Sequence, residues 1–212
     1  MNHRAARRPS TPSHRPWATS IAVLTVGCLT FLIPGARVEA GTPPPVPSGL
    51  EVPAGNRPFL RAHAVGTQTY VCLTSPSGYT WGFFGPQATL FTDEATPLVT
   101  HFVSPNPNEG GTPRATWQHS RDTSRVWARQ IAMSSDPAFV ERGAIPWLLL
   151  GVVGAEFRPS GSRKLSDATY IQRVHTSGGL APTTGCAEAP DVGKKALVPY
   201  AADYVFYRGA RS

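Results

Sequence analysis

The residues best suited to chemistry in this chain are the histidines that follow residue 40, namely His63, His101, His119 and His175. Imidazole titrates close to neutral pH and is the commonest metal ligand in proteins. These histidines lack the close spacing of a metal motif such as H-E-x-x-H, so the sequence indicates no metal site. A hydrolase or lyase would have to assemble its site from distant residues such as His101, Asp122 and His175.

The densest polar and aromatic segment runs from Ala115 to Trp127. An indole face flanked by short polar side chains suits a sugar or an aromatic ligand, through stacking and directional hydrogen bonds. In a plainer alternative, Trp117 and Trp127 are core residues on two strands joined by a turn at Ser120–Thr123. The candidate ligand-binding residues are Trp117, Gln118, His119, Asp122, His101, Arg173 and His175.

Several catalytic and cofactor motifs are absent. The sequence contains no G-x-S-x-G nucleophile elbow, no phosphate-binding loop, no C-x-x-C pair and no G-x-G-x-x-G dinucleotide fingerprint. It therefore indicates no cofactor and favours a non-catalytic binding module for a surface glycan or a small molecule. An enzyme with a non-standard polar site and a structural envelope protein are the alternatives.

The first 40 residues have the organisation of a secretory signal peptide. A basic start leads into the apolar run Ile21–Ile33, and Val38-Glu39-Ala40 follows as a small-x-small cleavage site. A membrane span needs about 20 apolar residues, and this run is shorter. We therefore expect cleavage near Ala40, no membrane span in the mature chain, and a location outside the cell or in the periplasm or envelope.

The charge of the mature chain is modest. Five of the 20 basic and one of the 13 acidic residues precede Gly41, so 15 basic and 12 acidic residues remain, a formal charge of +3. Proteins that bind nucleic acids carry clustered basic patches, and none is evident here. The composition therefore gives no support to nucleic-acid binding.

Two of the three cysteines remain after cleavage, Cys72 and Cys186. Disulfides persist in exported proteins, so an even number of cysteines indicates a bond between them. Two buried free thiols are the alternative. Cys28 lies in the apolar run and would be the lipid anchor if the precursor were processed as a lipoprotein.

Residues 41–58 contain consecutive prolines, which favour extended polyproline II, so we expect a proline-rich tether or an extended lead-in outside the core. Residues 59–212 suit a single domain. The sequence predicts a mainly β fold, an antiparallel sandwich or barrel with short strands and turns rich in Gly and Pro, because no stretch sustains helical spacing. The expected strands are Ala62–Leu73, Thr80–Phe84, Ala88–Phe91, Leu98–Val103, Ala115–Gln118, Arg125–Met133, Ile145–Val153, Tyr170–Thr176 and Tyr204–Tyr207.

Two features refine these expectations. Along the first strand Gln68, Tyr70 and Cys72 share one face, as two-residue alternation requires. The apolar run Trp147–Val153 fits a buried helix or a strand buried on both faces. We favour the strand because Gly151 and a further glycine soon after would weaken a helix.

Five segments, taken in order, carry a family resemblance: Gly66–Cys72, Ala115–Gln118 with Asp122–Ser124, Ile145–Leu150, Ile171–Cys186 and Val198–Tyr207. In these the chain resembles the domain-of-unknown-function family 3455, known from secreted bacterial and fungal proteins. The resemblance implies a secreted domain over about residues 66–207, and its cysteine positions agree with a disulfide. It supplies no activity, ligand or catalytic residue. His175 departs from the family, where Asn is expected.

Exported protein should begin at Gly41, because the small residues Val38 and Ala40 define the cleavage site. N-terminal sequencing of exported material checks this. A chain that keeps Met1, or one that carries a lipid on Cys28, would contradict the prediction.

Overall fold

The structure, a computed structural model, describes residues 41–157 and 164–210 of the chain. The predicted signal peptide, with Cys28 and the cleavage site after Ala40, lies outside the described residues. Within the described ranges, no helical segment has the length and apolar character of a membrane span.

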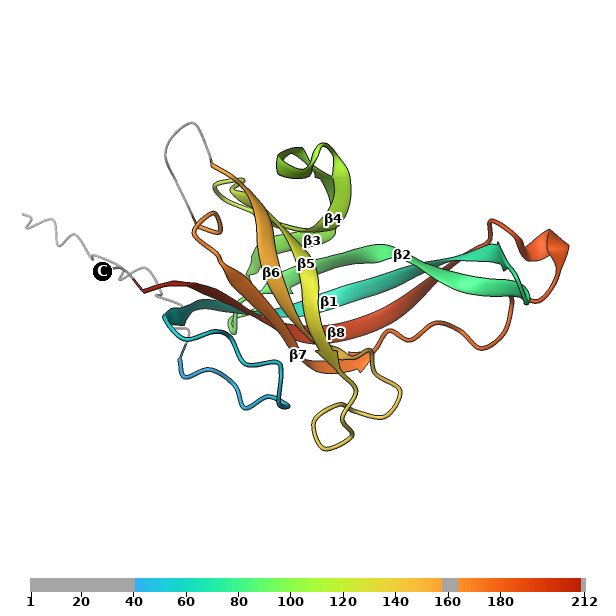
Figure 1. Cartoon of the computed structure of the whole chain (residues 1–212), viewed down its shortest axis with the longest axis horizontal. Helices are drawn as coiled ribbons and strands as arrows, with labels where there is room; N and C mark the ends of the chain where they lie inside the picture. Colours follow the sequence, from blue (N-terminus) through green and yellow to red (C-terminus); the bar gives the residue numbers. More distant parts are fainter. Residues whose placement is uncertain (1–40, 158–163, 211–212) are drawn as a thin grey trace, which may run out of the picture. The chain divides into compact units, whose positions relative to one another are not determined.

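Eight antiparallel strands close into a barrel in which each strand pairs with the next, and the last returns to the first (Figure 1). The strands are β1 (Asn56–Ser75), β2 (Gly78–Phe91), β3 (Pro97–Asn106), β4 (Thr112–His119), β5 (Arg125–Ser134), β6 (Trp147–Glu156), β7 (Tyr170–Gly178) and β8 (Lys195–Gly209). The 3₁₀ turns η1 (Pro107–Glu109) and η2 (Ala189–Asp191) are the helical elements of the described residues. The mainly β, antiparallel prediction is confirmed, and the architecture is a closed barrel rather than a sandwich.

The strands follow the predicted stretches, but several are longer. β1 spans 20 residues and β8 spans 15, and both extend with β2 beyond the other strands (Figure 1). The stretches 80–84 and 88–91 form one strand, because a bulge near Gly85 lets the pairing of β2 with β1 continue past Pro86. Gly85 and Pro86 predict a break between two strands, but pairing with β1 continues through both residues.

Alternate residues of each strand point into the barrel, as the two-residue period of extended backbone requires. Every strand contributes to the inner apolar cluster, which includes Leu90, Val99, Trp117 and Phe206. Trp117 and Trp127 are each only 1% exposed, so the alternative in which both are core residues is confirmed. A turn at residues 120–122 joins their strands.

A second apolar cluster covers the outer face of β6 and β7. Leu50 lies in this cluster at 1% exposure, and its carbonyl accepts a hydrogen bond from Gln172 Nε2 at 2.6 Å. The expectation that residues 41–58 form a tether outside the core is therefore wrong: the segment is extended, but it packs on the barrel.

The ambiguous run Trp147–Val153 is part of β6, as predicted. Leu150 belongs to the inner cluster, and Trp147 and Leu149 belong to the outer one. The run Trp147–Val153 is apolar because both faces of this part of the strand are covered.

Cys72 in β1 is bonded to Cys186 in the loop between β7 and β8, which confirms the predicted disulfide. The Gly193 amide donates to the Cys72 carbonyl, and the Cys72 amide donates to the Lys194 carbonyl, each at 2.9 Å. Trp81 Nε1 donates to the Thr184 carbonyl at 3.0 Å. The loop is thus fastened to the extended part of β1 and β2.

Replacing both cysteines by alanine should lower the free energy of unfolding by about 4 kcal/mol, because the bond joins residues separated by 114 positions. Urea unfolding followed by tryptophan fluorescence measures the change, with the reduced wild-type protein as control. An unchanged unfolding midpoint would show that backbone hydrogen bonds alone hold the loop.

Candidate functional site

The barrel wall opens where neighbouring strands separate. β4 and β5 pair only over residues 115–118 and 125–128. Beyond these, residues 112–114 pair with β3 on one side, and residues 129–134 pair with β6 on the other. The two strands therefore diverge and leave space between them for side chains or a ligand.

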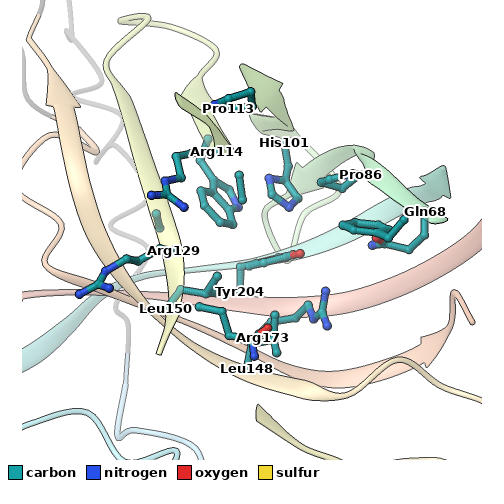
Figure 2. A pocket seen from close by; sticks show the side chains of 15 residues that line it. Gln68, Pro86, His101, Pro113, Arg114, Arg129, Leu148, Leu150, Arg173 and Tyr204 are labelled. Carbon is teal, nitrogen blue, oxygen red and sulfur yellow. The ribbon is translucent and has the colours of Figure 1, made fainter. Parts of the chain in front are cut away.

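A cavity of about 490 Å³ lies at this opening (Figure 2). Residues of β4 and β5 on both sides of the gap line it, together with residues from the other strands. The lining residues are Gln68, Phe83, Pro86, His101, Pro113, Arg114, Ala115, Trp117, Ala128, Arg129, Gln130, Leu148, Leu150, Arg173 and Tyr204. The lining includes three arginines and no Asp or Glu.

His101 and Trp117 form an aromatic pair in the cavity wall. They are opposite each other in the β3–β4 register, and their rings stack at 4.1 Å with an angle of 10° between the planes. His101 Nδ1 donates to the Thr116 carbonyl at 2.8 Å, which leaves Nε2 as an acceptor. Burial, opposed by this hydrogen bond and assisted by the charge of Arg173, lowers the pKa of His101 to about 3. The imidazole is therefore neutral at physiological pH.

Arg173 places a positive charge in the barrel interior. It pairs with Leu148 of β6 and Tyr204 of β8, and its Nη2 donates to the Pro146 carbonyl at 2.7 Å. Among the described residues it makes no ion pair with a carboxylate within 4 Å. Its charge opposes the rise that burial causes in the pKa of Tyr204 and of Tyr70.

The hydroxyl groups of Tyr204 and Tyr200 lie 3.5 Å apart near this charge. Burial raises the pKa of both tyrosines above the ordinary value. Both hydroxyls are therefore neutral across the physiological range and can donate or accept hydrogen bonds.

Unpartnered donors gather in the cavity lining. Buried polar atoms are almost always hydrogen-bonded, so each exception requires an explanation. Seven buried side-chain nitrogen or oxygen atoms of the described residues lack a partner, and three belong to the lining: Gln68 Nε2, Trp117 Nε1 and Arg173 Nε. They come from three different strands that meet at one cavity.

The profile of a family described as "Protein of unknown function (DUF3455)" matches residues 53–208. This chain belongs to the DUF3455 family. The range holds every cavity-lining residue of the DUF3455 domain, from Gln68 to Tyr204. No curated protein and no solved structure matches the chain.

Three predicted ligand-binding residues, His101, Trp117 and Arg173, meet in the cavity of the DUF3455 domain. Gln118 follows Trp117 and faces the other way, because alternate residues of a strand point to opposite faces. Its Oε1 accepts hydrogen bonds from Arg125 at 2.8 and 3.1 Å. Gln118 therefore braces the outer surface of the hairpin rather than lining the cavity.

His119 and Asp122 lie buried in the β4–β5 hairpin, and neither lines the cavity. Asp122 accepts hydrogen bonds from the Ser124 hydroxyl at 2.7 Å and from the Lys164 amide at 3.0 Å. His119 Nδ1 accepts from the Arg121 amide at 3.2 Å. These contacts hold the turn and account for the polar residues of that segment.

His175 lies on the outer side of the barrel, in a bulge of β7, with a backbone φ of 49°. Its Nδ1 is 2.9 Å from Asp203 Oδ2, and His63 Nδ1 is 2.6 Å from Asp203 Oδ1. The set His101, Asp122 and His175 is therefore not brought together. No group of three His, Cys, Asp or Glu in the described residues could hold a metal ion.

Sequence reasoning missed most residues of this cavity, among them Gln68 and Tyr204. Alternation along the first strand places Gln68 on the same face as Tyr70 and Cys72, and Gln68 is only 2% exposed. A polar amide that shares a strand face with a tyrosine and a cysteine is the signal that could have identified it, since cysteine is among the most buried residue types whereas glutamine is usually exposed. No comparable signal distinguishes Tyr204 from the other tyrosines of β8.

The neutral state of His101 predicts a pH dependence of stability. Its folded pKa of about 3 lies below the value of 6.5 expected when unfolded, so the unfolded chain binds more protons on acidification. This contribution to stability is complete above pH 6.5 and is lost as the pH falls toward 3. Urea unfolding between pH 7 and pH 4 should show a shallower loss of stability in His101→Gln than in the wild type.

The imidazole can also be followed directly by NMR. Its carbon-bound protons should show no titration between pH 8 and pH 5. A midpoint near 6.5 would contradict the buried, neutral state of His101.

Proposed function

We propose that this DUF3455 domain is a non-catalytic binding module that holds a small molecule in the cavity of its barrel. The observation that carries the proposal is the set of unpartnered buried donors on Gln68, Trp117 and Arg173, all in the lining of one cavity. A volume of about 490 Å³ is in the range of small-molecule sites. A ligand that brings acceptors would also account for polar groups that the protein leaves without partners.

The electrostatics of the cavity favour binding over acid–base catalysis. A general acid or base works best with a pKa near the operating pH. The pKa of His101 is about 3, and that of Tyr204 is raised from 10 by burial. Neither His101 nor Tyr204 is therefore tuned toward neutrality, which weakens the hydrolase or lyase alternative.

The position of Trp117 favours a small molecule over a surface glycan. Sugar-binding surfaces present an exposed ring face, whereas Trp117 is 1% exposed and stacks on His101. A ligand that reaches this pair must enter the barrel. A purely structural envelope protein would have no need of the unpartnered polar side chains.

The predicted export indicates the compartment in which the binding module would act. The first 40 residues follow the pattern of a signal peptide, and the Cys72–Cys186 disulfide is of the kind that persists outside the cytosol. The binding module would therefore act in the cell envelope or beyond it, where it would meet small molecules.

Filling the cavity should abolish binding. N-phenyl-1-naphthylamine, a neutral dye that fluoresces in apolar surroundings, should bind the wild type and bind Ala128→Phe about tenfold more weakly or less, because the added ring occupies the cavity. Thr100→Phe adds the same ring at an exposed position beside His101 and should leave binding unchanged. Fluorescence titration measures all three, and melting temperatures confirm that each variant is folded. Equal dye binding by all three proteins would contradict the proposal.

A further inference from the structure

The charge of Arg173 lacks a counter-ion among the residues that the structure describes. A charged group taken from water into a protein interior is normally paired with an opposite charge. The guanidinium contacts the Pro146 carbonyl, a neutral group, and the cavity lining holds no Asp or Glu. Its Nε–H, moreover, is buried without an acceptor among the described residues. The protein thus leaves a positive charge in the barrel wall for something else to neutralise.

Arg114, which lines the same cavity, has a carboxylate partner. Its Nε and Nη2 donate to the two carboxylate oxygens of Glu109 at 2.8 Å each. This pairing lowers the pKa of Glu109 to about 2. Arg129 is exposed and extends away from the other labelled side chains (Figure 2). Arg173 therefore differs from both, because it faces the interior and has no carboxylate.

Both polar and apolar groups line the space around Arg173. Gln68, Tyr204 and His101 surround the same space as the guanidinium (Figure 2). Leu148 and Leu150 supply an apolar wall, and the stacked ring of Trp117 supplies a flat one. The arrangement suits a molecule with an anionic end and a flat, apolar body.

We propose that the ligand of this cavity is a small aromatic carboxylate, whose carboxylate group neutralises Arg173 and whose ring packs against the apolar wall. The inference rests on the proposed binding function and adds the chemical class of the ligand. Arginine donors match the planar geometry of a carboxylate, and such charge-assisted hydrogen bonds are about twice as strong as neutral ones. Gln68 and the Tyr204 hydroxyl supply further neutral donors beside it.

The test compares 2-naphthoate with 2-naphthamide, two molecules of nearly equal shape that differ in charge. Isothermal titration calorimetry at pH 7 should show that the purified protein binds 2-naphthoate about tenfold more tightly or better. Arg173→Met keeps the length of the side chain and removes the charge, so the preference should disappear. Arg173→Lys should restore part of it, and Arg114→Met should keep it in full, because Arg114 is already paired with Glu109.

A measurement on the wild type alone guards against a variant that fails to fold. Affinity for 2-naphthoate should be constant from pH 8 to pH 6 and fall as the ligand's own carboxyl group becomes protonated near pH 4. Affinity for 2-naphthamide should stay constant over the same range. Equal affinities for the two molecules at pH 7, or a preference that survives in Arg173→Met, would overturn the inference.

Binding of the dye distinguishes a failure of the anionic-ligand inference from a failure of the proposed binding function. If N-phenyl-1-naphthylamine occupies the cavity but the carboxylate has no advantage over the amide, the binding module stands and the anionic ligand is wrong. If neither the dye nor either naphthalene compound binds, both proposals are overturned.

Discussion

The pairing of β8 with β1 fixes the architecture of this protein. The two strands pair from Asn56 opposite Gly209 to Val71 opposite Lys195, with one shift of register between Pro58 and Leu60, and this pairing closes the barrel. Closure removes the free edges that an open sheet would expose and encloses the alternate side chains of every strand in one interior. It also brings Gln68 of β1 and Tyr204 of β8 into the lining of one cavity.

Elsewhere in the fold, several buried polar groups find partners within the protein. The Tyr70 hydroxyl donates to the Gly179 carbonyl at 2.7 Å, and the Tyr207 hydroxyl donates to Gln172 Oε1 at 2.5 Å. Four unpartnered atoms of the described residues, on Arg61, Thr69, Trp147 and Arg208, lie outside the cavity lining, whereas those of Gln68, Trp117 and Arg173 belong to residues that line one cavity. An unsatisfied buried donor is typically worth about 1–3 kcal/mol of lost stability, so the cavity lowers the stability of the fold when it is empty. A binding function explains why such a site is present.

Several features followed from local sequence and were confirmed. The strands, the pairing of Cys72 with Cys186 and the core position of the two tryptophans are properties of spacing, of cysteine number in an exported chain, and of alternation. The predicted tether was wrong because proline disfavours helix but does not prevent packing, and Leu50 finds an apolar surface on β6 and β7. The site was only partly predicted, since Gln118, His119, Asp122 and His175 have their partners elsewhere.

Residue type and near neighbours fix which residues are extended, which cysteines can bond and which side chains carry chemistry, so these features can be inferred from the sequence. Which of those side chains meet depends on how the strands pair in three dimensions. His101 and Trp117 stack because β3 and β4 pair in one register, whereas Gln118 turns outward through the alternation of a single strand. Barrel closure brings together the residues around Arg173 from strands remote in sequence, and these contribute no Asp or Glu to the cavity lining within the described part of the chain.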